Sequence, residues 1–196
     1  MVATPSTMLA LGTSASDFRL PEPSSGGFVA RDDFADRPAL LVMFLCNHCP
    51  YVNHVVREIV RIASEYQARG VGVVALSSND VNQHPEDSPE AMARYATQHG
   101  FTFPYLYDES QEVTRAYEAA CTPDFFLFDA ERKLVYRGQM DGARPANDLP
   151  IDGRDLRAAL DATLSGSAVS ELQHASLGCN IKWRHGSEPD FAFRVA

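Results

Sequence analysis

Two cysteines separated by two residues are the part of the sequence best suited to chemistry. Cys46 and Cys49 enclose Asn47 and His48, and Pro50 follows directly. This spacing lets the two sulfur atoms come within bonding distance, so the pair can cycle between a dithiol and a disulfide. The sequence therefore predicts thiol–disulfide exchange. Cys46 is expected to attack a disulfide as the nucleophile, and Cys49 to attack Cys46 and release the product.

The surroundings of Cys46 predict an exposed and ionised thiol. A helix that begins near Cys49 would bring its unpaired N–H groups close to the Cys46 sulfur, and their partial positive charge stabilises a thiolate. His48 adds a group that can carry positive charge near the same sulfur. His48 is therefore expected to tune the pKa of Cys46.

Hydrophobic patterning predicts the elements that position this pair. The run 39–45 is continuously apolar, which is typical of a strand buried on both faces and central in its sheet. After Pro50, apolar residues recur at three- and four-residue steps as far as Gly70, which indicates a helix over about 49–69. The cysteine pair is thus expected where a strand passes into a helix.

Strands and helices continue to alternate along the chain. The pattern predicts further strands over 71–77, 125–128 and 134–139 and helices over 88–99, 110–120 and 155–164. The short connection between the last two strands favours an antiparallel pair. We therefore expect an α/β fold with a central mixed β-sheet flanked by helices.

One domain should span residues 1–196, with a core over about 10–165, an N-terminal extension and a C-terminal tail over 166–196. In the tail, Phe191, Phe193 and Val195 alternate with other residues, which predicts an arm lying on this domain rather than on a neighbouring chain. A homodimer remains open.

Composition excludes several classes of protein. The 17 basic and 26 acidic residues give a net charge of −9, so no broad basic surface is expected for nucleic acid. The longest apolar run is far shorter than the roughly 20 residues that span a bilayer, and no secretory signal is indicated. We expect a cytoplasmic protein in which closely spaced cysteines are catalytic or metal-binding rather than structural.

The strand, the Cys46–Cys49 motif, its helix and the later Cys121-Thr122-Pro123 ahead of FFLFD together resemble the thioredoxin superfamily. The resemblance implies a thioredoxin-like fold in which Pro123 is cis and lies against the cysteine pair. It also implies that Thr122 offers backbone groups to a substrate chain. Asn47 and Thr122 are therefore the candidate substrate-binding residues, and Pro123 joins the catalytic set.

The N-terminal stretch is similar to the peroxiredoxin-like (AhpC/TSA) branch of this superfamily. The matching residues are Gly12, Ala15, Asp17-Phe18, Leu20-Pro21, Asp33-Phe34 and the following LLVMF. Peroxiredoxins carry Thr or Ser three residues before their reactive cysteine and Pro seven before, but counting back from Cys49 gives Cys46 and Val42. Their catalytic arginine would fall at Pro123. A peroxiredoxin-like antioxidant peroxidase is therefore the alternative function rather than the first.

The other two cysteines are possible auxiliary redox groups. Cys121 precedes Thr122 and is expected near the redox centre, either as a third active thiol or as a small buried apolar residue. Cys179 lies in a segment that resembles one in the peroxiredoxin-like subgroup. That segment could fold over the active site and pair Cys179 with Cys121.

Metal binding is a further alternative. A CxxC pair is half of a zinc site, but no second pair follows, and His174 and His185 complete no recognised pattern. A copper carrier would use Cys46 and Cys49 with a distant histidine, and His84 and His99 are the candidates. The leading hypothesis therefore includes no metal and no cofactor.

Polar residues elsewhere have simpler explanations. His54, Arg57 and Arg144 could lie near the mouth of the site, but solvated surface positions are favoured, and Glu58 is expected on an exposed helix face. The acidic stretch 85–90 should cap the next helix. The expected partners are protein or small-molecule disulfides and a reductant such as a thioredoxin or glutathione system.

Overall fold

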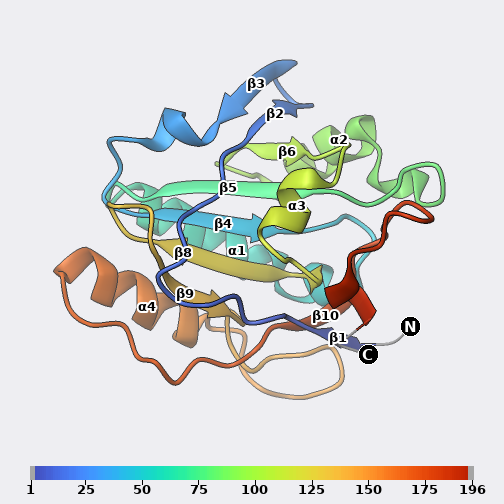
Figure 1. Ribbon diagram of the computed structural model, residues 1–196. Coiled ribbons are helices and arrows are strands. Elements are labelled where there is room, and N and C mark those ends of the chain that lie inside the picture. The colour runs from blue at the N-terminus through green and yellow to red at the C-terminus, as the bar shows by residue number, and fades with distance from the viewer. Residues whose placement is uncertain (1–2, 194–196) are drawn as a thin grey trace.

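The computed structural model describes residues 3–193 and is built around a five-stranded sheet (Figure 1). In spatial order its strands are β6 (Tyr105–Tyr107), β5 (Gly72–Ser77), β4 (Leu40–Phe44), β8 (Asp124–Phe128) and β9 (Leu134–Gly138). β4, β5 and β6 are parallel, whereas β8 is antiparallel to both of its neighbours. The sheet is mixed, as predicted, and the strand before the cysteine pair is its middle strand.

Helices and irregular segments cover both faces of this sheet (Figure 1). The helices are α1 (Pro50–Gln67), α2 (Pro89–His99), α3 (Glu112–Ala116) and α4 (Arg154–Ser165). α1, α2 and α4 share one core with Leu41 of β4, while Val42 faces a second core with the N-terminal segment and Tyr117 after α3. Successive strand residues point to opposite faces, so burial on both sides explains the continuous apolar run. Within the described part of the chain, no helix has the length and apolar character needed to cross a bilayer.

Shorter strands surround this frame. β1 (Ala3–Pro5), β10 (Leu177–Asn180) and β7 (Cys121–Thr122) form one antiparallel sheet, β2 (Arg19–Glu22) and β3 (Gly27–Ala30) form a hairpin, and 3₁₀ turns span Arg31–Phe34, Pro85–Asp87 and Asp190–Phe193. In the first sheet β10 lies between β1 and β7. Two segments distant in sequence are thus brought together immediately before Pro123.

The long elements confirm the predictions and the short ones add to them. α1, α2, α4, β4, β5, β8 and β9 all lie within the predicted ranges or differ from them by one or two residues at their ends. The helix predicted over 110–120 is wrong in length: α3 ends at Ala116, and Glu118 has a φ of 50°, outside the right-handed helical region. The sequence did not predict β1, β2, β3, β6, β7 or β10, whose few residues show little periodicity.

The described part of the C-terminal tail is hydrogen-bonded to the rest of the chain. The Ile181 N–H donates to the Ala120 carbonyl at 3.0 Å, and the Asp80 N–H donates to the Lys182 carbonyl at 2.8 Å. Farther along, the rings of Trp183 and Phe191 lie 6.0 Å apart between centroids. Val195 lies outside the described residues. The tail is therefore an integral part of the fold from β10 onwards.

A glycine allows β10 to approach β7 closely. A Cβ atom placed on Gly178 would lie 1.9 Å from the carbonyl oxygen of Thr122, which belongs to the backbone and cannot rotate away. The register pairs the next residue, Cys179, with Thr122. Gly178 therefore sets how near Cys179 comes to the residue before Pro123.

We predict that Gly178→Ala destabilises the protein by about 1–3 kcal/mol, because the added methyl group forces β10 away from β7. Urea unfolding measures the change. Gly27→Ala is the matched control, since its added Cβ meets only Ser25 Oγ at 3.4 Å, and it should alter stability by less than about 0.5 kcal/mol. Equal stabilities for the two variants would contradict the close approach.

Candidate active site

The cysteine pair lies at the strand-to-helix junction, but it is not exposed. Cys46 follows β4, and Cys49 is the N-cap residue of α1. Their exposed fractions are 1% and 0%. The expectation of an exposed Cys46 is therefore wrong, because Cys179 of β10 contacts Cys49 and the turn at Pro85–Asp87 is hydrogen-bonded to the loop between the cysteines.

Sulfur atoms and Thr122 form the centre of the site. Cys49 Sγ lies 2.8 Å from Cys179 Sγ and 3.2 Å from the Thr122 carbonyl oxygen. Cys46 Sγ lies 3.2 Å from Thr122 Oγ1. The Thr122–Pro123 peptide bond is cis, as the resemblance implied. Thr122 therefore contacts both members of the CxxC pair and holds the cis-proline segment against them.

The environments of the two cysteines shift their pKa values in opposite directions. Hydrogen bonds from the thiols of Cys179 and Cys46, helped by the Val52 N–H, hold the pKa of Cys49 far below its usual range despite burial. The hydrogen bond with Cys49, burial and the Asp87 carboxylate raise the pKa of Cys46 well above its usual value. The Val52 N–H in the first turn of α1 is one of the groups that lower the pKa of Cys49. The thiolate is thus favoured at Cys49.

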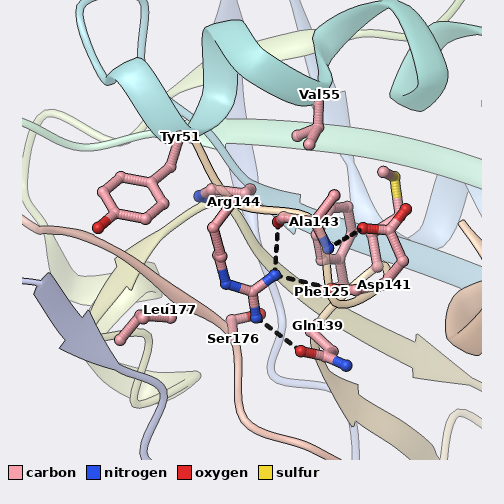
Figure 2. Close-up of a pocket in the computed structure, with 11 residues that line it drawn as sticks. Tyr51, Val55, Phe125, Gln139, Asp141, Ala143, Arg144, Ser176 and Leu177 are labelled. Carbon is pink, nitrogen blue, oxygen red and sulfur yellow. Dashed lines mark hydrogen bonds between the residues drawn. The ribbon is translucent and has the colours of Figure 1, made fainter. Parts of the chain in front are cut away.

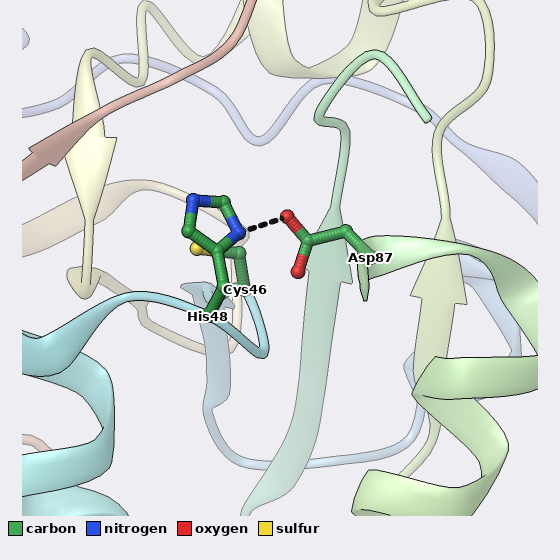
Figure 3. A group of neighbouring side chains, drawn as sticks. All are labelled: Cys46, His48 and Asp87. Atoms are coloured by element: carbon green, nitrogen blue, oxygen red, sulfur yellow. Dashed lines mark hydrogen bonds and ion pairs between the residues drawn. The ribbon is translucent and has the colours of Figure 1, made fainter. Parts of the chain in front are cut away.

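His48 is paired with a buried carboxylate beside Cys46 (Figure 3). His48 Nδ1 lies 2.6 Å from Asp87 Oδ2, and the Asn79 amide donates to the same oxygen at 2.7 Å. The Asn47 N–H donates to the other carboxylate oxygen at 2.8 Å. This network joins the turn before α2 to the cysteine loop.

The pairing changes the expected role of His48. The hydrogen bond to Asp87 raises the pKa of His48. Burial alone would raise the pKa of Asp87, but hydrogen bonds from His48 and Asn79 outweigh it and hold that pKa below its usual value. The positive charge of His48 is therefore offset by Asp87, which itself raises the pKa of Cys46. That His48 tunes the pKa of Cys46 stays a prediction.

No pattern in the sequence marks Asp87 as a site residue. It stands in the acidic stretch that was expected to cap α2, and Ser88 does cap that helix by accepting a hydrogen bond from the Ala91 N–H at 3.3 Å. Asp87 has no solvent exposure, and its carboxylate points to the cysteine loop rather than to the helix. Only the tertiary fold brings this residue to the site.

Among residues 3–193, two groups of side chains offer donors of the kind that metals bind. Cys46, His48 and Asp87 each contribute one ligand atom within 4.8 Å of the others, and so do His48, His84 and Glu86. The rings of His48 and His84 are stacked with centroids 5.0 Å apart. Of the two histidines considered for copper, His84 is therefore near the site, whereas His99 packs against Tyr95.

Asn47 holds the cysteine loop in place. Its side-chain amide donates to the Glu86 carbonyl at 2.9 Å, and its amide oxygen accepts from the Tyr105 hydroxyl at 3.2 Å. Its own carbonyl accepts from the Asn53 amide at 2.9 Å. These contacts give Asn47 a positioning role, and its contact with substrate stays a prediction.

The predicted pairing of Cys121 with Cys179 is not found. In the antiparallel register Cys179 lies opposite Thr122, and Asn180 lies opposite Cys121. Neighbouring strand residues point to opposite faces, so Cys121 and Cys179 point away from one another. Cys121 is fully buried, and burial raises its pKa well above the usual value. This environment fits a small apolar residue better than a redox thiol.

A small cavity lies beside Pro123 (Figure 2). Its volume is about 20 Å³, and its lining includes Tyr51 and Arg144. The Arg144 guanidinium donates to the carbonyls of Asp141 and Ala143, each at 2.7 Å, and to the Gln139 side chain. Arg144 is thus committed to its own loop rather than solvated.

The remaining polar candidates lie away from the sulfur atoms. Arg57 is exposed, as expected, and His54 is half-buried. The expectation for Glu58 is wrong: it is buried and pairs with Arg61 and Arg157 at 2.8 and 3.0 Å. Glu58 therefore stabilises the contact between α1 and α4.

A second buried carboxylate, that of Asp124, belongs to the first residue of β8. Asp124 is fully buried, and its Oδ2 has no hydrogen-bond partner among the described residues. Burial raises its pKa from 3.8 to about 8. Its negative charge, when present, also raises the pKa of Cys121. No sequence pattern distinguishes this residue, which stands between the cis-proline and an apolar run.

Comparison with known proteins supports a redox protein of thioredoxin-like fold. Residues 10–151 match the family model described as Redoxin. An uncharacterized conserved protein from Geobacillus kaustophilus is 51% identical, with a TM-score of 0.93 over 95% of this chain and 99% of that one. No curated protein matches the chain.

More distant structures share the fold. A putative thiol:disulfide interchange protein DsbE from Chlorobium tepidum is 23% identical, with a TM-score of 0.60 over 80% of this chain and 99% of that one. Peroxidoxin BcpB from Mycobacterium tuberculosis is 18% identical, with a TM-score of 0.59 over 80% and 96%. The predicted thioredoxin-like and peroxiredoxin-like resemblance is confirmed at the level of the fold.

We predict that Asp87→Asn lowers the pKa of His48, because the neutral amide removes the hydrogen-bonded anion that favours the imidazolium. An NMR titration of the His48 ring measures this shift. Glu86→Gln is the matched control and should have a smaller effect, since Glu86 acts on His48 mainly through its charge. An unchanged titration in Asp87→Asn would contradict the pairing.

Asp124 should make the protein less stable as the pH rises. Between its unfolded pKa of about 4 and its folded pKa of about 8, the folded protein keeps a proton that the unfolded chain has lost. The free energy of unfolding should therefore fall by up to about 1.4 kcal/mol per pH unit in this window. Urea unfolding across the window should show Asp124→Asn gaining stability relative to wild type at each higher pH. A pH-independent difference would contradict the raised pKa.

Proposed function

The chain belongs to the Redoxin family, and we propose that it is a thiol–disulfide oxidoreductase whose redox centre is Cys46 and Cys49. The observation that carries this proposal is the environment of Cys49. Its sulfur lies at the start of α1, beside other thiols, and its pKa is held far below the usual range. The thiolate is the form of cysteine that attacks disulfides.

The order of the two cysteines follows from this protonation pattern. The Cys49 thiolate attacks one sulfur of a substrate disulfide, forms a mixed disulfide and expels the first substrate thiolate. Cys46 then loses its proton and attacks Cys49, which expels the second thiolate and leaves a Cys46–Cys49 disulfide. Two electrons pass from the protein to the substrate. These roles are the reverse of the sequence-based assignment.

The proton acceptor for Cys46 is the His48–Asp87 pair in this proposal. Each of the three residues places one polar atom within 4.8 Å of the others, and Asp87 holds the His48 ring through Nδ1. A base oriented by a third group is a common way to activate a nucleophile. His48 acts as the acceptor in its neutral imidazole form, and Asp87 is the positioning residue that holds the ring through Nδ1.

Substrates are protein or small-molecule disulfides, and a thioredoxin or glutathione system restores the dithiol. Cys46, Cys49 and Cys179 are each exposed by 1% or less, so access requires movement of β10 or of the turn before α2. Thr122 would offer its backbone to a substrate chain only after β10 has moved, because β10 is paired with it.

Activity of cysteine variants tests the proposal. We predict that Cys49→Ser reduces turnover of a protein disulfide such as insulin to the uncatalysed rate, and that Cys46→Ser lowers it less completely. Cys121→Ser is the control, because Cys121 does not contact the CxxC sulfurs among the interactions described, and it should keep wild-type activity. Full activity in Cys49→Ser would disprove the assigned centre.

Peroxide reduction by the same thiolate is the second candidate function. A cysteine of lowered pKa at the start of a helix suits attack on a peroxide oxygen, and neighbouring thiols can resolve the sulfenic acid that results. Peroxide consumption with the same reducing systems distinguishes the two. Faster turnover of peroxide than of disulfides would favour the antioxidant peroxidase. Metal analysis of reduced protein tests the carrier alternative, which requires about one zinc or copper ion per chain.

A further inference from the structure

The C-terminal strand brings a third thiol to the cysteine pair. β10 pairs with β7 in a register that sets Cys179 opposite Thr122, the residue that contacts both Cys46 and Cys49. Gly178 permits this approach, because any larger side chain would collide with the Thr122 carbonyl. The position of Cys179 is therefore fixed by backbone pairing rather than by a flexible side chain.

Cys49 lies between two thiols. Its sulfur is 2.8 Å from Cys179 Sγ, and both Cys179 and Cys46 lower its pKa through hydrogen bonds. A disulfide bond is about 2.03–2.05 Å long, so less than about 1 Å of movement separates the Cys49–Cys179 contact from a bond. Cys49 can therefore bond to either neighbour, one in its own loop and one on β10.

We propose that Cys179 is a third redox thiol that exchanges with Cys46 for the bond to Cys49. The proposal rests on the proposed redox function of Cys46 and Cys49. It assigns to Cys179 a partner different from the Cys121 that the sequence had suggested, and it makes β10 part of the redox centre.

The exchange is balanced within one chain. Cys179, as a thiolate, attacks Cys49 Sγ of the Cys46–Cys49 disulfide. The Cys49–Cys179 bond forms, the Cys46–Cys49 bond breaks, and the proton lost by Cys179 is regained at Cys46. The step is an isomerisation with no net oxidation. When Cys49 instead carries a mixed disulfide, attack by Cys179 expels the substrate thiol and completes the substrate's reduction.

The exchange has a structural consequence. The Cys46–Cys49 disulfide closes within one loop and leaves β10 held only by non-covalent contacts. The Cys49–Cys179 disulfide ties β10 to the start of α1, with Thr122 paired beneath it. The Cys49–Cys179 disulfide therefore holds β10 covalently over the backbone of Thr122 and leaves Cys46 as a free thiol. The choice of disulfide thus decides whether the site can open.

Disulfide mapping tests the proposal. Reduced protein is treated with glutathione disulfide, quenched with acid, alkylated, digested and analysed by mass spectrometry without reduction. We expect Cys46→Ser to carry a cross-linked peptide joining Cys49 to Cys179 in most of the oxidised molecules. A stable Cys49–glutathione adduct with Cys179 alkylated would overturn the proposal. Cys121→Ser is the control and should give the wild-type pattern.

Two further measurements keep the test decisive. The first uses wild-type protein, in which no substitution can disturb folding. It should yield a cross-link between the peptide that holds Cys46 and Cys49 and the peptide that holds Cys179, with Cys46 alkylated. The absence of this cross-link would count against the proposal. The residual activity expected for Cys46→Ser should disappear in Cys46→Ser/Cys179→Ser. Activity unchanged by the second substitution would contradict a redox role for Cys179.

The outcomes also distinguish this proposal from the proposed function. A Cys46–Cys49 disulfide in Cys179→Ser, together with no Cys49–Cys179 bond in Cys46→Ser, would preserve the oxidoreductase and remove the third thiol. If neither disulfide forms in any of these proteins, the proposed redox centre itself is wrong.

Discussion

The site depends on the burial of one sulfur atom, that of Cys49, among groups that can donate hydrogen bonds to it. A buried thiolate is costly unless it is hydrogen-bonded, and Cys46, Cys179 and the Val52 N–H supply those bonds. Each donor comes from a different part of the chain: the cysteine loop, β10 and the first turn of α1. The central strand β4, the start of α1 and the docked tail therefore have to be placed together to give Cys49 this environment.

The main strands and helices could be predicted from the sequence because they follow from hydrophobic periodicity. The apolar run of β4, the three- and four-residue steps of α1 and the β8–β9 hairpin each reflect local patterning that survives folding. The cis-proline after Thr122 came from family resemblance rather than from pattern, and it is confirmed. The CxxC pair could be located for the same reason, since its spacing and its place between β4 and α1 are both visible in sequence.

What the sequence missed arises from contacts between distant segments. In sequence Asp87 resembles any charged residue in the first turn of a helix, but in the fold its carboxylate is hydrogen-bonded to His48, the residue expected to act on Cys46. Cys179 reaches Cys49 only because β10 pairs with a strand of two residues, too short to show a pattern. The helix α1 begins at Pro50, within one residue of the predicted start, so the position of Cys49 as its N-cap residue could be read from the sequence, whereas the thiol of Cys179 beside it could not.

The location of the thiolate is the central claim, and the ultraviolet absorbance of thiolate followed during an acid titration tests it most directly. In reduced protein, the thiolate signal should persist below neutral pH in wild type and in Cys46→Ser, where Cys179 and the Val52 N–H still donate to Cys49. It should be absent from Cys49→Ser over the same range. A signal that survives in Cys49→Ser and vanishes in Cys46→Ser would place the thiolate on Cys46 and contradict the account.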